Sequence, residues 1–333
     1  MAPPTTRLDG PAVLADGLQR RFDGTAAVEG LDLRVERGEI YGFLGPNGAG
    51  KTTTVRMLTT LLSPTGGRAT VAGRDVVRDP GGVRLRIGVA LQDVSLDPKQ
   101  TGAELLRLQG RLYGLDRRAV TRRVEQLAAL IDLGDALDRR VATYSGGMRR
   151  RLDLAAALVH NPEVLFLDEP TTGLDPVSRA RVWGEVQRLN EDLGMTIFLT
   201  TQYLEEADAL ADRVGIIDRG RMVAEGTPTQ LKRSVGSDVI VARVGGDPAQ
   251  VAPALRRLPG IRQVEVHGGG ELVIATDDGP AALSPVAVAL AASEVPVREL
   301  TMRTPTLDDV FLELTGSRIE PGETDDDHEE AAA

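Results

Sequence analysis

Residues 45–53 read Gly45-Pro46-Asn47-Gly48-Ala49-Gly50-Lys51-Thr52-Thr53, which fills the phosphate-loop pattern G-x-x-x-x-G-K-[ST] without a substitution. The apolar run 40–44 before it predicts a buried parallel strand, and residues 53–62 after it predict a helix. A helix N-terminus that follows a strand and a glycine turn offers N–H groups and partial positive charge to an anion. We expect Lys51 to reach the β- and γ-phosphates of a nucleotide, and the Thr52 hydroxyl to bind Mg²⁺. The alternative is a glycine-rich turn beside a surface lysine.

Composition limits the classes of protein that this chain can represent. Its 333 residues suffice for two domains, and 41% hydrophobic residues suffice for a core. It has no cysteine, so disulfides and thiolate metal sites are excluded, and its three histidines have no metal-ligand spacing. A net charge of −10 argues against a nucleic-acid partner. No apolar stretch approaches the ~20 residues of a membrane-spanning helix, and the N-terminus does not resemble a signal peptide. We therefore expect a cytoplasmic protein.

The periodicity of apolar residues predicts four consecutive parts. Short strand-like runs surround the phosphate loop, a stretch with helical period follows, and strands then alternate with helices up to a strand pair over the turn 218–220. The chain ends in a block of acidic residues, which is typical of disorder. The expected parts are a flexible N-terminus (1–11), an α/β nucleotide-binding domain (12–233, with a helical subdomain at about 93–160), a small α+β domain (234–316) and a disordered acidic tail (317–333).

The small C-terminal domain has a recognisable order of elements. Strands are expected at 238–244, 261–266, 271–276 and 295–302, with helices at 248–258 and 280–292. The order β-α-β-β-α-β is that of ferredoxin-like domains. Thr306-Leu307-Asp308-Asp309 then resembles a capping box that begins a last amphipathic helix.

Two further motifs carry chemistry. In the first, Ser145 is a natural helix N-cap, and Gly146 and Gly147 after it let the backbone approach an anion closely. By itself this motif could be an ordinary helix cap. In the second, the apolar strand 164–167 delivers Asp168 and Glu169 at its carboxyl end, where open α/β sheets bind ligands. We expect Asp168 to hold Mg²⁺ and Glu169 to act as general base on the attacking water.

Together these motifs resemble ABC-type ATPase subunits, a branch of the P-loop NTPases, over about residues 12–230. The phosphate loop, the signature 144–148 and the pair Asp168-Glu169 match that family. The resemblance implies ATP and Mg²⁺ as ligands and adds three expected site residues. Gln92 matches the glutamine loop, which senses Mg²⁺ and contacts the membrane partner. Phe22 matches the aromatic residue that stacks on adenine, with a core phenylalanine as the alternative, and Asp175 matches the aspartate loop at the dimer interface.

A closer resemblance is to the daunorubicin/doxorubicin-resistance type of bacterial drug-export ATPase. Three stretches carry it and extend the match to about residue 316: the signature at 143–151, the switch region at 200–208 and the C-terminal motif at 306–311. In that subgroup the C-terminal domain supports assembly with the membrane subunit. The resemblance therefore implies the same role for residues 234–316.

The chain departs from the general ABC pattern at Met148, where glutamine is usual, and at Gln202, where histidine is usual. A glutamine amide can donate a hydrogen bond but does not titrate near neutral pH. Our hypothesis is that Gln202 senses the γ-phosphate while Glu169 alone acts as the base.

The resemblance implies a translocase that powers the efflux of a hydrophobic drug, antibiotic or lipid. Its expected partners are a second copy in a head-to-tail dimer, with Ser145 of one copy closing on the ATP of the other, and a separate integral membrane permease. The chain would then lie on the inner face of the cell membrane. Two alternatives stay open: an importer ATPase whose C-terminal domain is regulatory, and a soluble ABC ATPase outside transport.

Overall fold

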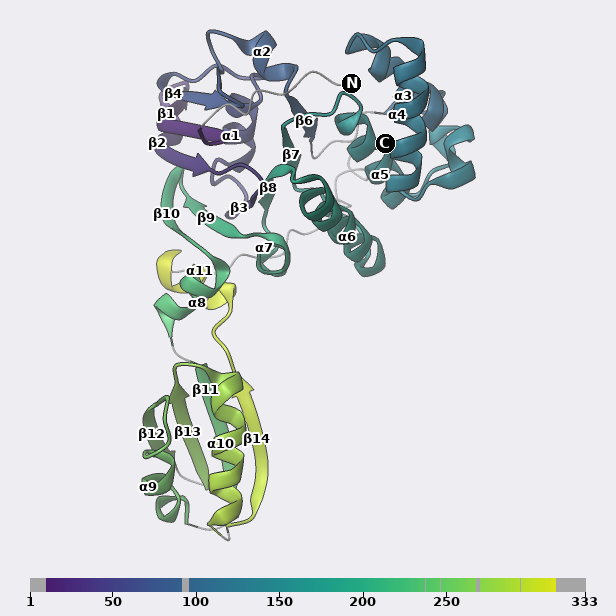
Figure 1. Ribbon diagram of the computed structural model, residues 1–333. Helices are drawn as coiled ribbons and strands as arrows, with labels where there is room; N and C mark the ends of the chain where they lie inside the picture. The colour runs from purple at the N-terminus through teal and green to yellow at the C-terminus, as the bar shows by residue number, and fades with distance from the viewer. Residues whose placement is uncertain are drawn as a thin grey trace, which may run out of the picture. The chain divides into compact units, whose positions relative to one another are not determined.

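The computed structural model describes residues 10–91, 96–236, 238–245, 247–267, 270–293 and 295–315. The chain divides into two compact units at Pro228/Thr229, and each is described by itself (Figure 1). The sequence predicted this boundary near residue 234, which lies at the end of helix α8 (Pro228–Val235). The observed division comes earlier, at the start of that helix. The expected N-terminal lead-in (except residues 10 and 11) and the acidic tail lie outside the described residues.

A six-stranded sheet forms the centre of the first unit, in the order β10-β9-β3-β8-β7-β6. Five strands are parallel, and β10 joins the edge as an antiparallel hairpin with β9. The three central strands are buried along their whole length, as their continuous apolar sequences predict. The bounds are β3 (Ile40–Leu44), β6 (Ile87–Ala90), β7 (Val164–Asp168), β8 (Thr196–Thr201), β9 (Arg213–Asp218) and β10 (Arg221–Gly226).

A second, antiparallel sheet has the order β2-β1-β4-β5. Its strands are β1 (Val13–Phe22), β2 (Thr25–Val35), β4 (Gly66–Val71) and β5 (Arg74–Asp75), with α2 (Pro80–Arg84) following. Helix α1 (Lys51–Leu58) shares one apolar core with this sheet and with Phe43, Phe166 and Phe198 of the central sheet. The helix is shorter than the expected 53–62, because Thr60 adopts a left-handed φ of 64° and ends it.

The opposite face of the central sheet is covered by helices. Leu165, Leu167, Ile197 and Leu199 alternate with the phenylalanines and pack into a second core with these helices. The helical part expected between the α/β pieces is present as α3 (Gly102–Leu112), α4 (Arg117–Leu130), two 3₁₀ turns (Gly134–Asp138 and Val141–Thr143) and α5 (Gly146–Leu158). Helices α6 (Pro176–Leu193) and α7 (Leu204–Leu210) complete the unit.

The second unit has the expected ferredoxin-like order. Its antiparallel sheet runs β12-β13-β11-β14, so the first and third strands of the motif lie in the middle. One expected element is wrong: residues 248–258 form a 3₁₀ turn and a one-turn helix α9, because Pro253 has no N–H to donate. The bounds are β11 (Asp238–Val244), a 3₁₀ turn (Pro248–Gln250), α9 (Ala252–Leu255), β12 (Ile261–His267), β13 (Glu271–Thr276), α10 (Gly279–Ala292) and β14 (Val297–Arg303).

The expected capping box is confirmed at the start of α11 (Leu307–Thr315). Asp309 N donates to Thr306 Oγ1 at 3.3 Å, and the Asp309 carboxylate accepts from Thr306 N at 2.9 Å. The N–H groups of Thr306 and Asp309 at the start of the helix are thereby satisfied.

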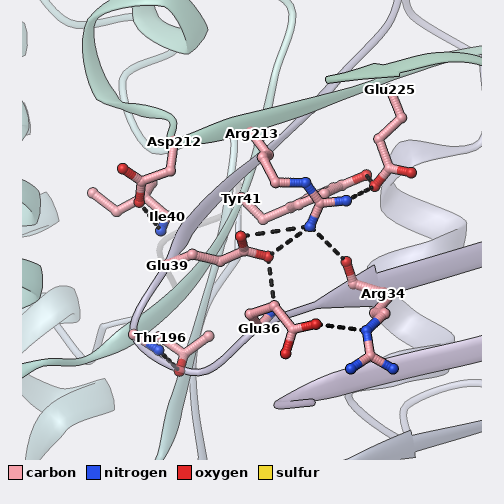
Figure 2. A network of polar contacts seen from close by, with 10 residues as sticks. Arg34, Glu36, Glu39, Ile40, Tyr41, Thr196, Asp212, Arg213 and Glu225 are labelled. Atoms are coloured by element: carbon pink, nitrogen blue, oxygen red, sulfur yellow. Dashed lines mark hydrogen bonds and ion pairs between the residues drawn. The ribbon is translucent and has the colours of Figure 1, made fainter. Parts of the chain in front are cut away.

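A polar network connects the ends of several strands at the end of the central sheet opposite the phosphate loop (Figure 2). Arg213 on β9 donates to Glu39 at 3.1 Å, to Glu225 on β10 at 2.6 Å and to the carbonyl of Arg34 on β2 at 3.1 Å. The Tyr41 hydroxyl donates to the same Glu225 at 2.8 Å. This single guanidinium therefore joins segments from both sheets.

Candidate active site

The phosphate loop connects the end of β3 to the first residue of α1. Gly48 and Gly50 have φ values of 79° and 105°, which favour glycine. A Cβ at Gly45 would lie 2.4 Å from Ile217 O, and one at Gly50 would lie 2.5 Å from Ala27 O. Because backbone closes on the loop from two sides, only glycine fits at these positions.

The tip of the β9–β10 hairpin supports the loop from behind. Gly220 N donates to Ala49 O at 2.9 Å, and Gly220 O accepts from Glu29 N at 2.8 Å. The backbone of one glycine thus bridges the phosphate loop and β2. The loop is held in place before any ligand arrives, as an anion site requires.

Lys51, the first residue of α1, is only 4% exposed. Its Nζ donates to Gly45 O at 2.7 Å and to Pro46 O at 3.1 Å, and lies 3.2 Å from Glu169 Oε1. Burial lowers the pKa of Lys51, and the charge of Glu169 acts against that shift. The Lys51 ammonium therefore binds two loop carbonyls and a carboxylate. A bound polyphosphate would compete with these groups for the ammonium.

Asp168 ends β7, and Glu169 directly follows it. The Thr200 hydroxyl, on neighbouring β8, donates to Asp168 Oδ1 at 2.5 Å and accepts from Glu169 N at 3.1 Å. The Thr172 hydroxyl donates to Glu169 Oε2 at 3.3 Å. Glu169 has a left-handed φ of 48°, a backbone conformation that is strained for a residue with a side chain.

The signature Ser145 caps α5, because its Oγ accepts from Met148 N at 3.3 Å. Ser145 and Gly146 are exposed. A small hollow of about 40 Å³ lies beside them, with Arg151, Ser178 and Arg181 in its wall. A helix N-terminus next to two guanidinium groups provides a positive environment.

Gln202 follows β8 and is 5% exposed. Its Oε1 is buried and has no hydrogen-bond partner in the described part of the chain. Such a buried acceptor costs free energy unless a water or another donor pairs with it.

Asp175 caps α6 by accepting from Val177 N and Ser178 N, both at 3.0 Å. The Ser178 hydroxyl, which donates at 2.6 Å, lowers the pKa of the Asp175 carboxyl. The exposed loop before α6 is therefore fixed at its helix end.

Phe22 lies at the end of β1 and is 42% exposed, with the Arg20 guanidinium 4.4 Å from its ring centroid. It is not a core residue, so the alternative raised from the sequence is wrong, while stacking on adenine stays a prediction. Gln92 lies outside the described residues, directly after Leu91.

Sequence reasoning missed Thr200 and Thr172. The available signal was the threonine pair that ends the apolar strand 196–201, because carboxyl ends of adjacent parallel strands meet at one edge. The structure brings Lys51, Asp168, Glu169 and Thr200 into direct contact. A cation, two carboxylates and a loop of N–H groups can bind a polyphosphate and direct water at it.

Comparison with protein families agrees with this geometry. The family model "ABC transporter" matches residues 28–172, and the model "ATP-binding protein DrrA1-3-like, C-terminal domain" matches residues 226–315. The daunorubicin resistance ATP-binding protein DrrA3 of Streptomyces coeruleorubidus is 50% identical over 92% of this chain and 96% of its own length. The chain belongs to the DrrA-type ATP-binding subunits of ABC transporters.

Two more comparisons support the DrrA-type assignment. The daunorubicin/doxorubicin resistance ATP-binding protein DrrA of Streptomyces peucetius is 47% identical over 96% of this chain and 97% of its own length. Among solved structures, cbiO1 from Clostridium perfringens, part of the ABC transporter complex cbiONQ, has a TM-score of 0.63 at 26% identity and covers 68% of this chain and 95% of its own. The chain is an ATP-binding and ATP-hydrolysing subunit of an ABC transporter. The relatives carry drug-resistance names, so neither the importer nor the soluble alternative is favoured.

Proposed function

We propose that this DrrA-type subunit powers export of a hydrophobic small molecule through a separate membrane subunit. The observation that carries the proposal is the buried contact of Lys51 with Glu169 beside Asp168, in a chain that matches drug-resistance subunits over nearly its whole length. The names of these relatives, which are daunorubicin and doxorubicin resistance proteins, support a drug or antibiotic as the cargo.

The residues present suit ATP with Mg²⁺. A small, hard cation prefers oxygen ligands and keeps several waters, and Thr52 and Asp168 offer a hydroxyl and a carboxylate. Within the described residues, no group of three acidic or histidine side chains could hold a metal alone. This fits a cation that depends on phosphate oxygens as well as protein. The cation would neutralise charge on the β- and γ-phosphates.

Glu169 is proposed to accept the proton of the attacking water. In this structure its carboxylate is paired with Lys51 Nζ. A bound γ-phosphate competes for that ammonium, and Glu169 is then free to accept a hydrogen bond from water. Gln202, which follows β8 and is buried, is proposed to donate its amide N–H to the same phosphate.

The second half of the ATP site is proposed to come from another copy of this chain. Lys51 and Glu169 are buried in contact with each other, whereas Ser145 and Gly146 are exposed at a helix N-terminus. An exposed N-terminus can close on a phosphate presented by a partner. A head-to-tail pair gives each ATP one phosphate loop and one signature, with Asp175 at the interface and Phe22 stacked on adenine.

The membrane subunit is proposed to dock on the groove beside β6. This groove of about 380 Å³ has an apolar wall formed by Leu61, Val89, Leu91 and Leu105. Gln92 is the next residue in the sequence after Leu91. An amphipathic helix of a permease suits such a groove. Within the described residues, no helix combines the length and apolarity needed to cross a membrane. Docking would hold this subunit at the inner face of the cell membrane, with residues 234–316 assisting assembly.

A pull-down tests the export proposal. The Glu169→Gln protein, tagged and incubated with ATP, is recovered from detergent-solubilised membranes of its host. Recovery of one multi-spanning protein supports the proposal. Ribosomal or DNA-repair proteins without a membrane protein would overturn it, and a complex containing an extracellular substrate-binding protein would indicate import.

The proposed dimer makes a separate prediction. We expect Glu169→Gln to bind ATP without hydrolysing it and to elute as a dimer from a sizing column, because only the base is lost. Ser145→Arg should stay monomeric, because a bulky cation blocks the signature surface. Equal elution of the two variants in ATP would contradict these separate roles.

A further inference from the structure

Arg150 lies on α5, in the turn after the Ser145 cap, and is 6% exposed. Its two neighbours in the sequence behave differently. Arg149 is exposed, and Arg151 donates to the carbonyls of Ile131 and Asp132 in the helical part. Among these three arginines, Arg150 is the one whose guanidinium bonds to the backbone beside Glu169.

Within the described residues, its hydrogen bonds go to three backbone carbonyls in other segments of the chain. Nε donates to Pro170 O at 2.9 Å, Nη1 to Leu91 O at 2.5 Å and Nη2 to Asp168 O at 3.2 Å. These carbonyls lie at or directly after the carboxyl ends of two adjacent parallel strands, β6 and β7. One planar guanidinium thus fixes three backbone positions at the carboxyl edge of the sheet, a geometry that the point charge of a lysine cannot reproduce.

Each carbonyl belongs to a segment with a task in ATP hydrolysis. Asp168 and Pro170 enclose Glu169, and Leu91 precedes Gln92. Glu169 has a left-handed φ of 48°, so its backbone needs support on both sides. The Thr200 hydroxyl accepts a hydrogen bond from Glu169 N, and Arg150 donates to the carbonyls of the two flanking residues.

Arg150 is a buried cation, and the charges of Asp153, Asp168 and Glu206 oppose the lowering of its pKa by burial. Asp153, one turn later, lies 3.5 Å from Nη1, and burial raises the pKa of Asp153 to about 6. Burial also lowers the pKa of Arg150. A buried cation whose main partners are carbonyls costs desolvation that an apolar side chain would avoid. Packing alone therefore does not account for arginine here.

We propose that Arg150 is a positioning residue for ATP hydrolysis: it fixes the backbone on both sides of Glu169 to the signature helix α5. A displacement of α5, when Ser145 engages a phosphate, then moves the segment that carries the base. This coupling rests on the proposed roles of Glu169 and Ser145.

Steady-state hydrolysis by the purified full-length chain tests the proposal, with four proteins compared: wild type, Arg150→Met, Arg150→Lys and a control, Arg118→Met, at an exposed position of α4 outside the signature. We expect Arg150→Met to lower kcat at least tenfold while KM and the affinity for a fluorescent ATP analogue change less than threefold. Arg150→Lys should recover part of kcat, and Arg118→Met should match wild type. Circular dichroism at the assay temperature verifies folding.

A second measurement separates positioning from a simple structural role. Arg150→Met combined with Glu169→Gln should still dimerise with ATP on a sizing column, because binding groups are intact. An unchanged kcat in folded Arg150→Met, with only a lower Tm, overturns the proposal. Loss of ATP binding or of the dimer in the double variant also overturns it. If wild type fails to hydrolyse ATP, or Glu169→Gln stays active, the proposed roles themselves are wrong.

Discussion

At the scale of single residues, the glutamine at position 202 distinguishes this chain from ATPases with a histidine at the switch. A glutamine contributes a hydrogen bond but no charge near neutral pH. Turnover should therefore depend on a single titrating base, Glu169, rather than on two groups.

Substitution of Gln202 tests that role. Gln202→Ala removes the proposed bond to the γ-phosphate, so we expect kcat/KM to fall by about tenfold, the equivalent of about 1.4 kcal/mol. Gln202→His, which can still donate, should retain most activity. If Gln202→Ala left both turnover and ATP affinity unchanged, the hypothesis would be wrong.

Glu185 on α6 gives a pH-dependent prediction. It is buried, and its Oε2 has no hydrogen-bond partner among the described residues. Burial raises its pKa from 4.5 to about 7, against the nearby charges of Arg151, Arg188 and Arg181 and together with that of Asp132. The fold therefore prefers the protonated carboxyl. Its contribution to stability is complete below the unfolded pKa and is lost as pH rises through about 7.

We expect Glu185→Gln to remove this dependence. Between pH 4.5 and pH 8 the wild-type free energy of unfolding should lose up to about 3 kcal/mol that the variant retains. Urea titrations of both proteins at pH 5.5 and pH 8 measure the difference. Parallel changes in the two proteins would show that Glu185 ionises normally.

Residue identities in the phosphate loop could be predicted from sequence because the chemistry requires a fixed local spacing. The contacts of Glu169 could not. Its hydroxyl partner Thr200 comes from a strand that is 31 positions away, and its left-handed backbone depends on the surrounding fold. The partners of Arg150 are equally remote, at 18 to 59 positions along the chain.

At the scale of elements, strand positions were easier to predict than helix ends. Strands 238–244 and 271–276 match β11 and β13, because alternating or continuous apolar runs bounded by glycine or aspartate fix their limits. Helix ends depend on single backbone torsions and on proline. The left-handed Thr60 ends α1 early, and Pro253 divides the expected helix at 248–258.

The polar network of Figure 2 makes a prediction at this scale. Arg213→Met leaves Glu39 and Glu225 without their shared cation, and burial already raises the pKa of Glu39. Because Glu39 is largely buried, we expect a loss of about 2–3 kcal/mol in the free energy of unfolding. Guanidinium unfolding measures it.

A matched control exists on the next strand. Arg221 pairs with Glu29 at 3.1 Å, but both side chains are well exposed. Arg221→Met should cost less than about 1 kcal/mol. Equal losses in the two variants would mean that the network contributes nothing beyond an ordinary surface pair.

At the scale of the whole molecule, the two units have separate apolar cores. The buried residues of the second unit's core, such as Leu255, Leu272 and Val286, lie between β11 and α10, and Leu300 of β14 packs against them. The sequence predicted two domains and the ferredoxin-like order, because each element signal is local. The residues that are fully buried in each core could not be predicted, since their burial depends on which faces of the helices and sheets pack together.

Separate cores predict unfolding in separable steps. Leu272→Ala, at a fully buried position, should cost about 2–5 kcal/mol in the second unit and lower one calorimetric transition. The transition that ADP raises, which belongs to the nucleotide-binding unit, should not move. Leu199→Ala should lower the ADP-sensitive transition instead. One transition that responds to both changes would contradict the prediction.

The tip of the β9–β10 hairpin has a consequence for protein engineering. Two-residue hairpin tips usually tolerate inserted epitope tags or fluorescent labels. Here Gly220 has a φ of 79°, and a Cβ would lie 2.8 Å from Ala27 O. Its backbone also bonds to Ala49 and Glu29. A tag inserted at residues 219–220 would reshape the phosphate loop from behind, so this outwardly ordinary turn is a poor attachment point for any reporter of transport.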